Sequence, residues 1–205
     1  MSSEVFEIIK RINLKRIETQ LILQCTPVIT NLKTSNLLII EKELAPTVRL
    51  VLDKTSISYV MLAELNDRVT FLLYDCEALE AYTEEEKCYE YLKNLGYVSN
   101  DLEEKIREFQ VRYQNYLVQK EVFPHELGIF LGYPIEDVVG FIENKGERPL
   151  ITGYWKVYSN PKAKAMLFRK IDIAQEELLR KVADGCDVVE IINGYHKKEE
   201  GLVAV

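Results

Sequence analysis

The chain has 205 residues, 47% of them apolar and 29% charged, which suits one ordinary globular domain. The net charge is −7, and the sequence contains no basic run of the kind that nucleic-acid binders use against phosphates. Its apolar runs are far shorter than the roughly 20 residues of a membrane span, and the first residues do not resemble a signal peptide. We therefore expect one cytoplasmic domain over residues 1–205, with a polar tail from about residue 195 and neither nucleic acid nor a membrane as partner.

Apolar residues recur with helical spacing over residues 4–12 and again over 14–23, which predicts helices at the start of the chain. Pro27 follows Thr26, and proline is favoured in the first turn of a helix. The pattern therefore predicts a new short helix from Pro27, capped by Thr26, with Cys25 just before it. An apolar run then predicts a buried strand near 37–41, and a helix with Pro46 in its first turn is expected next.

A β-hairpin is the strongest local signal. Two strand-like segments, 57–65 and 68–75, flank Asn66-Asp67, which is a good pair for a tight turn. Residues 76–95 predict a helix broken near Thr83, where Thr-Glu-Glu-Glu forms a capping box. The helix expected over 101–118 carries a regular apolar stripe of Leu102, Ile106, Phe109, Tyr113, Tyr116 and Leu117.

The last third of the chain predicts helices over 124–131 and 135–144, a strand over 152–158, and helices over 161–184 and 188–192. Few strands, including a hairpin, lie among many helices. The sequence therefore predicts an α+β fold, in which a small, mostly antiparallel sheet with strands near 37–41, 57–65, 68–75 and 152–158 is covered by helices.

Three segments carry a resemblance. They are Cys25-Thr-Pro with Lys-Thr-Ser-Asn-Leu from residue 33, Phe-Pro-His-Glu-Leu-Gly-Ile-Phe-Leu-Gly-Tyr-Pro with Ile-Glu-Asp-Val from residue 123, and Gly-Tyr-Trp-Lys-Val-Tyr from residue 153. Over about residues 20 to 185 the chain resembles a bacterial domain of unknown function of about 200 residues, common in clostridia and related Firmicutes. The resemblance implies no reaction and no cofactor, but it directs attention to these segments.

Cys25 is the candidate nucleophile. A thiol at the start of a helix feels the positive end of the helix dipole, which favours the reactive thiolate. His125 is the candidate base, because the other histidine, His196, is expected in the polar tail. The alternative is that Cys25 is a small buried core residue, as free cysteines often are. None of the four cysteines forms a Cys-x-x-Cys pair, and reduced thiols are expected because the sequence does not predict export.

His125 and Glu126 follow Pro124, so both are expected in the first turn of a helix. A neutral imidazole there can serve as a base, whereas the alternative is a structural residue bonded to a nearby loop. One histidine with one adjacent glutamate is not a metal signature, and no metal site is predicted. The glycine loops that bind nucleotide phosphates are also missing from the sequence, and the cofactor is unknown.

The segment over 152–158 is the candidate binding surface. In a strand, Tyr154, Lys156 and Tyr158 would share one face, and Trp155 would lie on the other. Lys156 could then hold an anionic group between aromatic rings, or the face could simply be solvated. We expect helix 124–131 and this strand to lie close together, with His125 or Tyr133 near the open face of the strand, because a polar group among aromatics is typical of a ligand pocket.

The two helices expected over 124–144, with 152–158 as a wing, are also compatible with a DNA-binding helix-turn-helix, whose second helix would enter the major groove. That helix carries Glu136, Asp137 and Glu143, which phosphates would repel, so the sequence does not favour DNA binding.

Two function hypotheses remain open, and whether the chain is an enzyme is uncertain. The favoured one is a binding or accessory protein for a small molecule or a partner protein, with the candidate binding residues Glu126, Tyr133, Tyr154, Trp155 and Lys156. The alternative is a thiol-dependent hydrolase or transferase that uses Cys25 and His125. One cysteine and one histidine are a thin basis for catalysis, which is why the first is favoured.

Overall fold

The structure is a computed structural model that describes residues 13–119 and 122–196. The helix expected over 4–12 lies outside the described residues. In chain order the elements are α2 (Ile17–Ile29), β1 (Ser35–Glu41), the 3₁₀ helix η1 (Lys42–Leu44), α3 (Ala45–Leu52), β2 (Ser58–Leu65), β3 (Arg68–Tyr74), α4 (Cys76–Glu84), α5 (Glu86–Asn94), α6 (Leu102–Gln119), α7 (Leu127–Phe130), α8 (Ile135–Glu143), β4 (Ile151–Thr152), β5 (Lys156–Val157), α9 (Pro161–Ala183) and α10 (Val188–His196). No described helix is both long and apolar enough to cross a bilayer.

The three-stranded sheet is antiparallel, with the strand order β1-β3-β2. Its hairpin confirms the prediction at Asn66-Asp67, since both residues have positive φ angles, 48° and 58°, as a two-residue type I′ turn requires. With a second, two-stranded sheet and a majority of helices, the predicted α+β class is confirmed.

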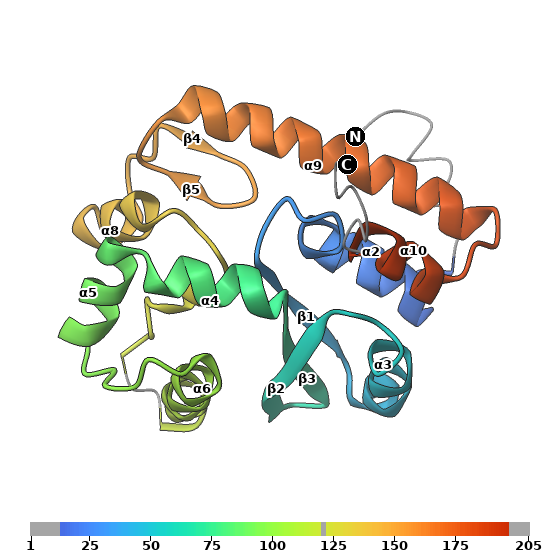
Figure 1. The fold of residues 1–205 in the computed structure, drawn as a ribbon, viewed down its shortest axis with the longest axis horizontal. Helices are drawn as coiled ribbons and strands as arrows, with labels where there is room; N and C mark the ends of the chain where they lie inside the picture. The colour runs from blue at the N-terminus through green and yellow to red at the C-terminus, as the bar shows by residue number, and fades with distance from the viewer. Residues whose placement is uncertain (1–12, 120–121, 197–205) are drawn as a thin grey trace, which may run out of the picture.

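The sheet separates two apolar cores. Because side chains alternate along a strand, Phe71 and Leu72 on β3 point to opposite faces. Phe71 packs in the core formed with α2, α9 and α10, and Leu72 packs in the core formed with α6, α7 and α8. Figure 1 shows α9 running across the top of the molecule, from the β4–β5 hairpin on the left to α10 on the right, and α6 on the other side of the sheet.

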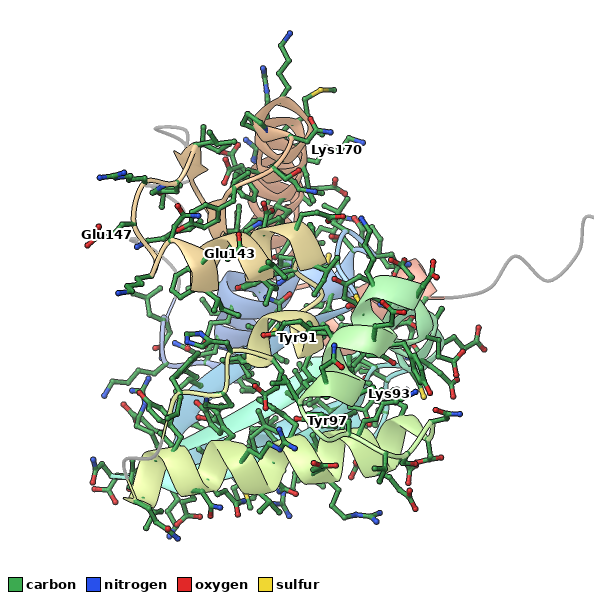
Figure 2. All side chains as sticks on the ribbon, turned by 90° about the vertical axis from the view of Figure 1, so that its left-hand side faces the viewer. Tyr91, Lys93, Tyr97, Glu143, Glu147 and Lys170 are labelled. Atoms are coloured by element: carbon green, nitrogen blue, oxygen red, sulfur yellow. The ribbon has the colours of Figure 1, made fainter. Side chains whose placement is uncertain are left out.

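Helix α6 confirms the predicted stripe. Ile106, Phe109 and Tyr113 are all buried, and Phe109 is fully so. Its ring stacks on Phe130 with 4.7 Å between the ring centroids, which joins α6 to α7. In Figure 2, Tyr97 lies beside α6, where its ring contacts the Arg112 guanidinium at 4.4 Å.

Helix α2 corrects the prediction around Pro27. No new helix begins there, since Pro27 lies inside α2 and Thr26 does not cap it. Instead, the Thr26 hydroxyl donates to the Ile22 carbonyl one turn earlier. The sequence places Cys25 at a helix start, but the structure places it in the C-terminal half of a continuous helix.

Two further boundaries differ from the predictions. The helix over 76–95 does break, but at the extended residue Glu85, and Thr83 stays inside α4 with its hydroxyl bonded to the Glu80 carbonyl. The last helix runs past its expected end at residue 192, because α10 continues to His196, whose side chain is 5% exposed. Its Nε2 lies 3.1 Å from the Val28 carbonyl oxygen and its Nδ1 lies 3.3 Å from Asp75 Oδ2, which ties α10 to α2 and to the start of α4.

The strand expected over 152–158 is a hairpin. Two-residue strands, β4 and β5, pair antiparallel, and the Gly153 N–H donates to the Trp155 carbonyl across the turn between them. A Cβ atom at Gly153 would lie 2.3 Å from the Phe168 ring, so only glycine allows the hairpin to pack this closely on α9. Burial still alternates as the sequence suggested, with Trp155 and Val157 buried and Tyr154 and Lys156 exposed.

Candidate functional site

A cavity of about 250 Å³ lies between α7, α8 and the β4–β5 hairpin. Its lining is mainly aromatic and aliphatic and comprises Phe123, His125, Leu127, Gly128, Leu131, Tyr133, Asp137, Val138, Phe141, Tyr154, Trp155 and Lys156. The predicted proximity of segments 124–131 and 152–158 is therefore confirmed, since both contribute to one cavity. We call this lining set the aromatic pocket.

Asp137 fixes the wall of the aromatic pocket. It lies in the first turn of α8 and is 2% exposed. Its Oδ2 accepts a hydrogen bond from the Trp155 indole N–H at 2.8 Å. Its Oδ1 accepts from the backbone N–H groups of Tyr158 at 2.8 Å and Ser159 at 2.9 Å. A buried carboxylate needs such donors, and these three anchor the β4–β5 hairpin to α8.

The aromatic rings of the wall are packed against one another. Trp155 stacks on Tyr133 at a centroid distance of 5.0 Å and an interplanar angle of 23°, and it meets Phe168 of α9 edge-on at 4.6 Å. Offset stacking and edge contacts are the favoured geometries of aromatic pairs, so this wall is preformed. Tyr154, at the rim, donates its hydroxyl to Asp172 Oδ1 at 3.0 Å.

Lys33 supports Tyr133 from outside the pocket lining. Its Nζ lies 4.7 Å from the centroid of the Tyr133 ring, and the residue is only 9% exposed. Burial disfavours the charged ammonium and lowers the pKa of Lys33 from 10.5 to about 7. The loop from residue 33, one of the segments in the resemblance, therefore reaches the pocket through this contact.

Among the described lining residues, His125 and Lys156 carry nitrogen donors that are not all used within the protein. The His125 ring lies between Phe123, at 5.3 Å, and Phe141, at 5.8 Å, and within the described residues its nitrogens have no hydrogen-bond partner. The Lys156 ammonium donates to the Gly146 carbonyl at 2.6 Å and also lies 5.8 Å from the Phe141 centroid.

Glu126 lies away from the pocket, although the sequence analysis placed it among the candidate binding residues. It is 5% exposed, and its carboxylate accepts hydrogen bonds at 3.3 Å from both Arg112 and Tyr97. These contacts fix the start of α7 against α6. Sequence reasoning also missed Asp137 and Phe141. The only signal for Asp137 was an acidic residue in the first turn of a helix, which usually reports a favourable dipole interaction on the surface.

Cys25 is fully buried in the core between α2 and the sheet, and its thiol lies 3.7 Å from the Leu37 carbonyl oxygen. Burial raises the pKa of the Cys25 thiol, which is the opposite of what a helix start would do. His125 belongs to the aromatic pocket, among residues of α7 and α8. The structure thus places the two residues of the thiol-enzyme hypothesis in different surroundings.

A second, wider depression of about 740 Å³ lies between α5, α8 and the residues that follow α8. Figure 2 labels Tyr91 and Glu143 on this side of the molecule. Its lining is more polar, and two of its charged members, Lys87 and Glu136, pair with each other at 2.8 Å. Small-molecule sites are typically apolar with a few convergent polar groups, so the aromatic pocket is the better candidate. Among the described residues, no group of His, Cys, Asp or Glu side chains has the arrangement of a metal site.

A comparison with known families finds one match. Residues 21–192 match the model of a family described as "Protein of unknown function (DUF3793)". No curated protein and no solved structure matches the chain.

Proposed function

The chain belongs to the DUF3793 family, whose function is unknown. For this member we propose a binding or accessory function, in which the aromatic pocket holds a small molecule. The observation that carries the proposal is a cavity lined mainly by apolar groups, whose wall is preorganised by the Asp137–Trp155 hydrogen bond. Preorganisation lowers the entropic cost of binding, since the wall need not order around the ligand.

The sequence and the fold support further parts of this proposal. We propose a single domain, because the two apolar cores share one sheet. We also propose action in the cytoplasm of a clostridial bacterium, because the resemblance suggests that source and the described cysteines are all free. A small molecule is favoured over a partner protein, because Tyr133, Tyr154, Trp155 and Lys156 line a concave cavity. No observation favours the thiol-enzyme alternative, since Cys25 is fully buried.

The proposal is tested with a screen of small aromatic and aliphatic fragments by saturation-transfer NMR. Trp155 is the only tryptophan, so the single indole N–H signal in a ¹H–¹⁵N spectrum reports directly on the pocket. We expect hits that shift this signal. In calorimetry, Leu127→Trp should abolish binding of these fragments, because the larger side chain of this half-buried lining residue would fill the pocket. Ile173→Trp, on the exposed face of α9, is the control and should leave binding unchanged. Hits that leave the indole signal unmoved and bind equally to Leu127→Trp would count against the pocket.

A further inference from the structure

The acidic group of the aromatic pocket is already saturated. Asp137 uses both oxygens to accept three hydrogen bonds, from Trp155, Tyr158 and Ser159. Among the described residues it is the only carboxylate in the pocket lining. A cationic ligand such as an amine would therefore find no free counter-charge, and burying an unpaired ammonium in an apolar cavity is costly.

The basic group of the pocket is not saturated. An ammonium has three N–H donors, and Lys156 gives one of them to the Gly146 carbonyl. No acidic side chain pairs with Lys156 in residues 13–119 and 122–196, and the residue is exposed at the pocket rim. Two donors on a positive charge therefore remain available to a ligand.

His125, which lines the same pocket, adds a further donor near Phe141. The centroid of its ring and the Lys156 Nζ each lie 5.8 Å from the centroid of the Phe141 ring. Its nitrogens make no hydrogen bond within the described part of the chain, and a neutral imidazole always carries one N–H. The available nitrogen donors of the pocket thus lie near Phe141, while Tyr133 and Trp155 supply a stacked aromatic wall.

We infer that the aromatic pocket selects a compact aromatic carboxylate, whose ring packs against Tyr133 and Trp155 and whose carboxylate accepts hydrogen bonds from Lys156 and His125. This inference rests on the proposed function and adds the ligand class to it. One permanent cation suits a single negative charge, and a phosphate dianion would need more donors than an apolar lining of this kind provides. A cavity of about 250 Å³ holds one ring with a short chain.

The test compares two probes that differ in charge and little in shape, 4-phenylbutyrate and its neutral amide 4-phenylbutanamide. Binding is measured by calorimetry and by the Trp155 indole signal. We expect the carboxylate to bind about tenfold more tightly than the amide, the usual worth of one charge-assisted hydrogen bond. Lys156→Met should remove that difference, and His125→Phe, which keeps a ring between Phe123 and Phe141, should reduce it. Lys170→Met, at an exposed site on α9 outside the lining, should preserve it (Figure 2).

The outcomes separate the inference from the proposed function. If both probes bind equally, shift the Trp155 signal and are lost in Leu127→Trp, the pocket is a binding site and the anionic preference is wrong. If the carboxylate preference survives in Lys156→Met, the assigned cation is wrong. If neither probe binds and no fragment shifts the Trp155 signal, both the inference and the proposed function fall. Circular dichroism of each variant checks that the fold is retained.

Discussion

The Gln175 side chain of α9 donates a hydrogen bond from Nε2 to the carbonyl oxygen of Leu23 in α2, at 2.9 Å. Leu23 lies four residues before Pro27, which has no N–H, so this carbonyl lacks its partner within the helix. Gln175 therefore replaces the missing donor, and this is how α2 continues through a proline.

A double-mutant cycle tests this replacement. Gln175→Leu should lower the free energy of unfolding by about 1 kcal/mol, because it leaves a partly buried carbonyl without a donor. In a Pro27→Ala background the new backbone N–H at position 27 can donate to the Leu23 carbonyl. There, Gln175→Leu should lower the free energy of unfolding by less than about half as much as in the native chain. Urea unfolding of the four proteins measures the coupling. Equal costs in both backgrounds would mean that Gln175 acts through packing alone.

Phe109→Ala tests the core between the sheet and α6. The Phe109 ring is fully buried, stacks on Phe130 and contacts the tilted ring of Tyr113, so its removal leaves a large cavity. We expect a loss of about 3–5 kcal/mol in the free energy of unfolding. Val111→Ala on the exposed face of the same helix, where Val111 is 54% exposed, should change it by less than about 0.5 kcal/mol. A small loss at Phe109 would contradict the packing.

The correct predictions rested on local signals. Asn66-Asp67 dictates a tight turn by its own backbone preference, and the stripe of α6 needs only helical spacing. The error at Pro27 had a non-local cause, because the donor that rescues α2 comes from Gln175, far along the chain. Sequence spacing cannot show such a bond.

The site was predictable in part for the same reason. Aromatic composition and short connections predicted the meeting of the segments that carry His125 and Lys156. The tertiary partners of Glu126 and Asp137 decided their roles: Glu126 turns toward Arg112, and Asp137 toward Trp155. Both carboxylates look alike in the sequence, at the start of a helix.

Lys33 should make stability depend on pH. Burial lowers its pKa to about 7, so the unfolded chain binds more protons than the folded chain between about pH 7 and 10.5, and stability rises with pH in that window. From pH 6.5 to 8.0 the gain is about 1 kcal/mol. Lys33→Met should lack this gain, whereas Lys170→Met should keep it, as measured by urea unfolding at both pH values. Parallel pH profiles for the native chain and Lys33→Met would contradict the buried amine.

Thiol labelling should follow exposure. Cys76 and Cys186 are exposed, whereas Cys25 and Cys88 are buried. Because burial raises the pKa of Cys25, little of its thiol is available as thiolate. We expect iodoacetamide at pH 8 to modify Cys76 and Cys186 first and to leave Cys25 unmodified until urea unfolds the protein, as followed by peptide mass spectrometry. Rapid labelling of native Cys25 would instead revive the thiol-enzyme hypothesis.

Asp137→Asn tests whether the pocket wall depends on one carboxylate. Asparagine has nearly the same shape, but one of its terminal atoms is an amide nitrogen, which cannot accept a hydrogen bond. Because all three groups around Asp137 are donors, the Trp155 indole or the Tyr158 and Ser159 amides must lose their acceptor. We expect a loss of about 2 kcal/mol in the free energy of unfolding.

The same variant should loosen the wall as well as destabilise the fold. Trp155 is 7% exposed, so a hairpin that detaches from α8 should shift its fluorescence to longer wavelength and weaken binding of 4-phenylbutyrate. Glu136→Gln is the matched control, one residue earlier on α8, where the exposed pair with Lys87 contributes less than about 1 kcal/mol. It should leave the Trp155 emission unchanged. If Asp137→Asn also keeps the native emission and stability, the wall is held by ring packing, because Tyr133 and Phe168 would then suffice to position Trp155.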